Sequence, residues 1–149
     1  MTRLIRGRGA QLERATMLAW AAVMMPFFLA VVGLTVDGGT VFDARRELQN
    51  TADSAARAGA GQIDQQVYRA SNGASVALDQ ASARVTAAQY VASQGADLNA
   101  VISSDDQHVL VSVSRDVPTN FLRLAGIDKV HIAADAPAEV RYGIDKGNK

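Results

Sequence analysis

The longest apolar run in the chain predicts a helix that spans a membrane. Twenty-two consecutive residues from Ala15 to Val36 carry no charge, with Glu13 and Arg14 before them and Asp37 after them. At about 1.5 Å per residue, a helix of this length covers roughly 33 Å, which matches the hydrocarbon core of a bilayer. The run exceeds the roughly 7–15 apolar residues of a cleaved signal peptide. We therefore expect residues 15–36 to form an uncleaved transmembrane helix.

Small residues recur within this run at steps of three or four, so they fall on one face of the helix. They are Ala15, Ala19, Ala22, Pro26, Ala30 and Gly33. A stripe of small residues lets the backbone of another helix approach closely inside a membrane. The pattern predicts a helix-packing face, and the alternative is that an alanine-rich chain places small residues on every face.

The same spacing continues beyond the apolar run and predicts one long helix. Its outer half, residues 37–70, reads as amphipathic, with a stripe of Val41, Ala44, Leu48, Ala52, Ala55, Gly59, Ile63 and Val67. Gly38 and Gly39 each cost about 1 kcal/mol in a helix interior. A break or bend at these glycines is therefore one expectation.

Residues 71–149 read as a small α+β domain. Ser71-Asn72-Gly73 is a turn cluster, and a second helix is expected after it, with an apolar face of Leu78, Ala81, Val85, Ala88 and Ala92. A hairpin of residues 101–103 and 108–117 is expected next, because valines alternate with other residues in its second arm. The alternating valines are Val109, Val111, Val113 and Val117.

The last part of the pattern is a turn followed by a strand. Pro118 ends the hairpin, Thr119 is expected to cap a single helical turn, and Gly126 closes that turn. The final strand carries Val130, Ile132, Ala134 and Ala136 on one side. The predicted fold class is α+β, with a long N-terminal helix, a second helix and a small, mainly antiparallel sheet.

The distribution of charge predicts the orientation in the membrane. Residues 1–14 hold four arginines and one glutamate, while residues 37–149 hold 11 basic and 14 acidic residues. The positive-inside rule places residues 1–14 in the cytoplasm and the C-terminal part across the cell membrane. Without a basic stripe, the main body is not expected to bind nucleic acid.

No set of residues in the sequence predicts catalysis. His108 and His131 are the only histidines and cysteine is absent, whereas a zinc site needs three or four converging ligands. Asp105 and Asp106 are read as a solvated turn, and no phosphate loop or nucleophile motif occurs. We expect no enzymatic activity, no metal, no cofactor and no small-molecule substrate.

A first segment runs from Glu13 through "GLTVDGG" to "ARRELQN-ADSAA", and its motif residues are Asp37, Gly38, Arg45, Arg46, Leu48, Gln49, Asn50, Ala52, Asp53 and Ala55. This segment resembles TadE/TadG-like proteins of Flp pilus assembly, the tight-adherence or type IVc system. The second, "VSVSRDVPTNFLRLAGIDKVHIAADAPAEV", is similar to the ending of short members. The resemblance implies a minor-pilin-like, membrane-anchored component that associates with other pilin-type subunits.

The sequence departs from type IV pilins at the peptidase site, where pilins present Gly before the cut and Glu as fifth mature residue. Cleavage after Gly9 makes Arg14 fifth, and cleavage after Arg8 makes Glu13 fifth but lacks the glycine. A retained membrane protein is therefore favoured over a processed one.

Two alternatives stay open at the level of the sequence. The chain could be a membrane-tethered binding or adhesion module that is not part of a pilus. Asp37 could pair with a cation on a partner helix, or it could only mark the boundary of the membrane.

Overall fold

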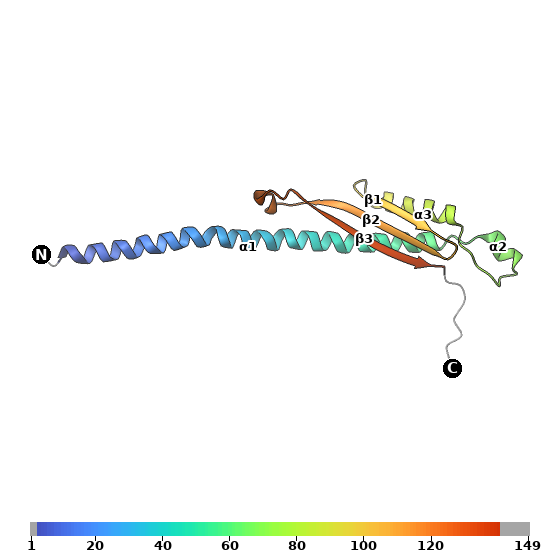
Figure 1. Cartoon of the computed structure of the whole chain (residues 1–149), viewed down its shortest axis with the longest axis horizontal. Helices are drawn as coiled ribbons and strands as arrows, with labels where there is room; N and C mark the ends of the chain where they lie inside the picture. The colour runs from blue at the N-terminus through green and yellow to red at the C-terminus, as the bar shows by residue number, and fades with distance from the viewer. Residues whose placement is uncertain (1–2, 141–149) are drawn as a thin grey trace, which may run out of the picture. The chain divides into compact units, whose positions relative to one another are not determined.

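The computed structural model describes residues 3–140, and side chains from residue 14 onward (Figure 1). Most of the predicted basic N-terminus, residues 1–14, and the last nine residues of the predicted 71–149 domain lie outside the described side chains. The elements follow the order α1 (Arg3–Ala60), α2 (Gln65–Ala70), α3 (Gln80–Gln94), β1 (Asn99–Ser104), β2 (His108–Pro118), η1 (Leu122–Ala125) and β3 (Lys129–Glu139). The α+β class predicted from the sequence is confirmed.

The chain divides into two compact units that share the helix α1. One unit holds residues 1–40 and 119–128, and the other holds residues 41–118 and 129–149. The first therefore contains the apolar part of α1 together with the turn around η1. The second contains the outer half of α1, the other helices and the sheet.

Helix α1 is continuous through Gly38 and Gly39, so the predicted break is absent. Two glycines cost about 2 kcal/mol in all, and the long helical stretches on both sides offset this. The helix ends at Ala60 rather than continuing to Val67. Asp64 instead caps a separate short helix, α2, by accepting hydrogen bonds from the backbone N–H groups of Gln66 (2.8 Å) and Val67 (3.2 Å).

The sheet of the second unit has three antiparallel strands in the order β1-β2-β3. The predicted hairpin is confirmed, with Val101 opposite Ser112 and Ile102 opposite Val111. Strand β3 pairs with β2 along its whole length and forms one edge of the sheet. Pro137, opposite Leu110, lies near the end of this edge strand.

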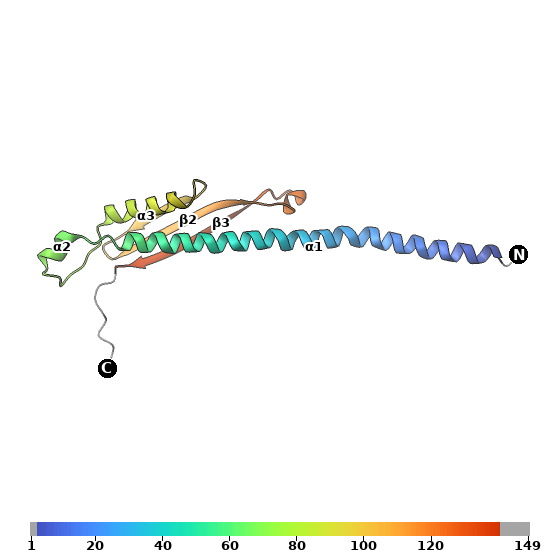
Figure 2. The same ribbon diagram turned by 180° about the vertical axis from the view of Figure 1, so that it is seen from behind.

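The core lies between one face of the sheet and the two long helices. Figure 2 shows α1 and α3 side by side on the same face of the sheet. The sheet contributes the valines of β2 that the alternation predicted, and also Ile132, Ala134 and Ala136. The outer half of α1 contributes the predicted stripe, of which Ala44, Leu48, Ala52 and Ala55 are buried.

The predicted apolar face of the second helix is wrong. Helix α3 buries Ala83, Ala87 and Val91, whereas Val85 is 56% exposed. An alanine-rich helix offers more than one stripe at a spacing of four, and periodicity does not separate them. The buried stripe faces Gly59 of α1, where an added Cβ would lie 3.0 Å from the carbonyl oxygen of Ala83.

Gly39 and Gly59 of α1 are expected to respond differently to substitution by alanine. A Cβ at Gly39 would meet nothing within 4 Å, so Gly39→Ala should stabilise the helix locally by about 1 kcal/mol. Gly59→Ala should gain nothing, because its Cβ crowds Ala83. Hydrogen exchange of the α1 amides in detergent-solubilised protein measures both effects, and faster exchange in Gly39→Ala would contradict the prediction.

Candidate functional site

Asp37 connects the end of the apolar run to a distant turn of the same compact unit. Its side chain is fully buried. One carboxylate oxygen accepts a hydrogen bond from the backbone N–H of Asn120 at 2.9 Å. The other accepts from Phe121 at 2.8 Å and from Leu122 at 2.7 Å. Asp37 thus holds three successive amides from residues more than 80 positions away.

These three amides need a partner because they begin a helical turn. The first N–H groups of any helix lack an acceptor within the helix, and Phe121 at the N-cap of η1 offers no side-chain cap. The prediction that Thr119 caps this turn is wrong, because its hydroxyl donates a hydrogen bond to the carbonyl oxygen of Ile127 instead. The carboxylate of Asp37 replaces it, since an anion is favoured beside unpaired backbone donors.

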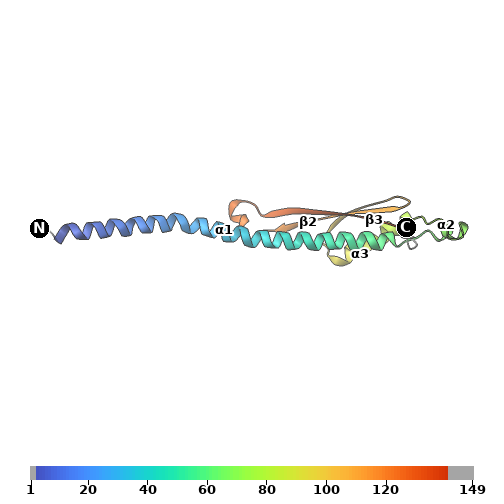
Figure 3. The same cartoon turned by 90° about the horizontal axis from the view of Figure 1, so that it is seen from below.

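Gly33, one helical turn before Asp37, makes a second contact between α1 and the turn of residues 119–128. An added Cβ at Gly33 would lie 2.6 Å from Cβ of Phe121 and 2.9 Å from Cγ of the same residue. Only glycine therefore allows Phe121 to pack directly on the backbone of α1. We call Gly33, Asp37 and the turn of residues 119–128 the Asp37 clasp, and Figure 3 shows this turn beside α1.

The charge of Asp37 is stabilised by backbone amides. Burial alone pushes the pKa of Asp37 upward, but hydrogen bonds from Leu122, Asn120 and Phe121 outweigh this and hold the pKa below its ordinary value. Asp37 is therefore ionised at neutral pH. Both of its carboxylate oxygens accept hydrogen bonds from residues of the same chain. The sequence had suggested only a pairing with a cation on a partner helix or a marker of the membrane boundary.

The other residues of the small stripe lie free along α1. Ala15, Ala19, Ala22, Pro26 and Ala30 are all exposed, whereas Gly33 is covered by Phe121. The described part of α1 includes one segment that is long and apolar enough to cross a membrane. Its large side chains are exposed as well, among them Trp20, Phe27 and Phe28.

The remaining motif residues lie in three kinds of surroundings: the core, a polar groove and the exposed surface of α1. Leu48, Ala52 and Ala55 are buried. Gln49 donates to Asp53 of the same helix and to the carbonyl oxygen of Asp135 on β3. Gly38 is half-buried, and Arg45 is exposed.

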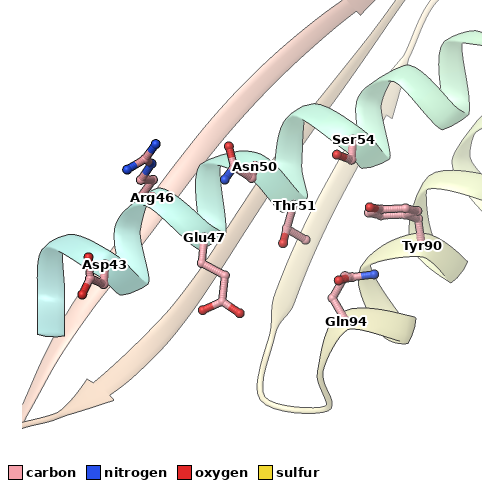
Figure 4. Close-up of a pocket in the computed structure, with 8 residues that line it drawn as sticks. All are labelled: Asp43, Arg46, Glu47, Asn50, Thr51, Ser54, Tyr90 and Gln94. Atoms are coloured by element: carbon pink, nitrogen blue, oxygen red, sulfur yellow. The ribbon is translucent and has the colours of Figure 1, made fainter.

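The groove lies between α1 and α3 and has a volume of about 350 Å³. Figure 4 shows residues that line it, among them the motif residues Arg46 and Asn50 on α1, and Tyr90 and Gln94 on α3. Glu47 in this lining accepts a hydrogen bond at 2.8 Å from the largely buried Arg115 of β2. The lining is polar and mixed in charge, and it presents no pairing of a nucleophile with a base.

The two histidines lie apart on the face of the sheet opposite the core. His108 pairs with Asp105 at 3.1 Å, and His131 pairs with Asp116 at 2.8 Å. Asp105 accepts backbone N–H groups of Gln107 and His108, which lower its pKa. Within residues 14–140, no three His, Cys, Asp or Glu side chains are grouped so that they could hold a metal ion.

The comparison with protein families identifies the N-terminal part of the chain. Residues 14–62 match the model of the family described as "Putative Flp pilus-assembly TadE/G-like". The resemblance seen in the first segment is thereby confirmed, and the match supports involvement in Flp/Tad pilus assembly. The second resembling segment lies outside the matched residues and stays a prediction. No curated protein and no solved structure matches the chain.

The sequence predicted Asp37 as a motif residue but missed its partners. Asn120, Phe121 and Leu122 stand in the second resembling segment, and no local pattern connects them to Asp37 across 83 to 85 residues. One signal was available in the sequence. The turn carries Phe121, Leu124 and Ile127 at a spacing of three, which is unusually apolar for a connection between strands.

Proposed function

We propose that the chain is a membrane-anchored, non-enzymatic component of a Flp/Tad-type pilus assembly system. The observation that carries this proposal is the family match over residues 14–62. This segment includes the apolar run of α1 with its exposed side chains. A helix that is apolar on all sides and not buried within its own chain is suited to lipid or to other apolar helices.

The proposed orientation places the N-terminus in the cytoplasm and residues 37–149 outside. Its support is the concentration of arginines before the apolar run, with Arg3, Arg6, Arg8 and Arg14 within the first 14 residues. The α+β domain is then displayed on the outer side of the cell membrane.

The proposed mechanism is association of pilin-type helices through the small-residue stripe. Five of its six members are exposed along α1. Inside a membrane, close packing of backbones drives helix association, because lipid is as apolar as the side chains. Other pilin-type or pilus-assembly subunits are therefore the expected partners.

A matched pair of substitutions tests this mechanism. Ala22→Leu, or Ala19→Leu with Ala22→Leu, adds bulk on the stripe. Ala21→Leu adds the same group off the stripe, since successive residues of a helix point roughly 100° apart. Tagged full-length protein from its native membrane should lose about tenfold in recovery of other pilus subunits only when the stripe is changed.

Membrane insertion should be equal in all variants, because leucine is as apolar as alanine or more so. Equal recovery of partners from the Ala22→Leu and Ala21→Leu proteins would refute association through the stripe. Release of the unchanged protein into the soluble fraction would refute the anchor itself.

A further inference from the structure

The turn of residues 119–128 exposes an unusual amount of apolar surface for its length. Leu124 is 85% exposed, Ile127 is 46% exposed and Phe121 is 42% exposed. Apolar surface that stays in water is unfavourable, and covering it would stabilise the protein in proportion to the area covered. A surface of this kind marks a site of contact.

The position of this turn along α1 is fixed by the Asp37 clasp. Phe121 packs on Gly33, which lies three residues before the end of the uncharged run at Val36. Three amides of the turn are bonded to Asp37, the first charged residue after that run. The turn therefore lies beside the last helical turn of the apolar segment, where hydrocarbon gives way to lipid headgroups.

The backbone of the turn is suited to such a place because its hydrogen bonds are made internally. Besides the amides held by Asp37, Thr119 N–H donates to Asp128 and Leu124 N–H to Phe121. The N–H groups of Gly126 and Ile127 donate to carbonyl oxygens of the same turn. A backbone that is already satisfied avoids most of the penalty for leaving water.

The turn carries one basic and one acidic residue, Arg123 and Asp128, and both are exposed. Arg123 stands exposed between the apolar residues Phe121 and Leu124. A long basic side chain at this depth can extend to the phosphate of a headgroup while its stem stays in an apolar layer. A basic side chain in this position is also attracted to anionic lipid headgroups.

We propose that the turn of residues 119–128 is a second membrane contact, with Phe121, Leu124 and Ile127 inserted into the outer interfacial layer of the bilayer and Arg123 bound to lipid phosphate. This inference rests on the proposed anchoring of α1 in the membrane. We propose lipid as the partner of these apolar side chains because the turn lies directly beside the membrane-spanning part of α1. The contact fixes the depth of the span and holds the turn against the lipid surface.

Because the chain contains no cysteine, a single introduced cysteine can be labelled specifically to test the proposal. Single cysteines are introduced as Leu124→Cys in the turn, Met24→Cys in the middle of the apolar run and Val101→Cys on β1. Val101 is 73% exposed and serves as the matched site outside the turn. Each full-length variant is labelled with an environment-sensitive fluorophore and reconstituted in phosphatidylcholine and phosphatidylglycerol vesicles. The vesicles contain no quencher, or lipids that carry a quencher near the glycerol end of the acyl chain for the interface, or lipids that carry it near the methyl end for the middle of the bilayer.

The label at Leu124 should be quenched by these lipids about threefold or more relative to the label at Val101, as for a side chain in the interface. Quenching at Met24 together with a water-exposed label at Leu124 would overturn the contact of the turn and leave the anchor intact. No quenching at either site would overturn both. A label at Leu124 that is shielded from water and is not quenched by these lipids would show a contact with a second copy, which also overturns the proposal.

Discussion

Leu48→Ala is expected to lower the free energy of unfolding of the second compact unit by roughly 3–5 kcal/mol. Among the side chains of residues 14–140, Leu48 is the largest that is fully buried, at 1% exposed. Its neighbours on the same stripe of α1 are alanines, which have no length with which to fill the space that it leaves. Hydrogen exchange of the slowest β2 amides, measured in detergent-solubilised full-length protein, reports the loss.

The matched control for this substitution is Leu110→Ala. Leu110 lies on β2 but on the opposite face of the sheet, and it is 43% exposed. Its truncation creates no enclosed cavity, so the expected loss is under about 1 kcal/mol. Equal losses from Leu48→Ala and Leu110→Ala would mean that the core does not lie where the structure places it.

Asp37→Ala is expected to release the turn of residues 119–128 from α1. The substitution leaves the amides of Asn120, Phe121 and Leu122 without their acceptor, and unpaired amides favour a conformation in which water reaches them. Hydrogen exchange of these three amides should become about a hundredfold faster. Helix α1 itself should persist, because alanine has a higher helix propensity than aspartate.

Asp43→Ala serves as the control, since Asp43 is an exposed aspartate of the same helix. It should leave exchange at residues 120–122 unchanged. Acid should imitate Asp37→Ala in the unchanged protein. The pKa of Asp37 is lowered in the folded chain, so its contribution is complete above the ordinary aspartate pKa of about 3.9 and is lost as the pH falls through the folded value. An opening of the turn between pH 5 and pH 8 would contradict this assignment.

The elements with a strict repeat could be predicted from the sequence. In β2, valines alternate with exposed or half-buried residues, and the structure buries Val109, Val111, Val113 and Val117. The outer half of α1 has its stripe at the predicted positions from Ala44 to Gly59. In both elements the spacing of branched or larger apolar residues leaves one arrangement that buries them.

The features that were missed depend on packing between distant residues. In α3, alanines stand on several faces, and the buried face is chosen by the close approach of Ala83 and Ala87 to Gly59. In the Asp37 clasp, Asp37 meets residues 83 to 85 positions away, and the two come together only once the chain has folded. Neither the buried face of α3 nor the contacts of Asp37 produce a periodic pattern in the sequence.

The edge strand β3 limits how copies of this domain can join. Pro137 has no N–H to donate, and the outward side chains along β3 include Lys129, Asp135 and Glu139. A strand from a second molecule that paired with β3 would lack a backbone N–H donor at Pro137 and would meet charged side chains. Both features disfavour extension of the sheet from one molecule to the next by strand addition along β3.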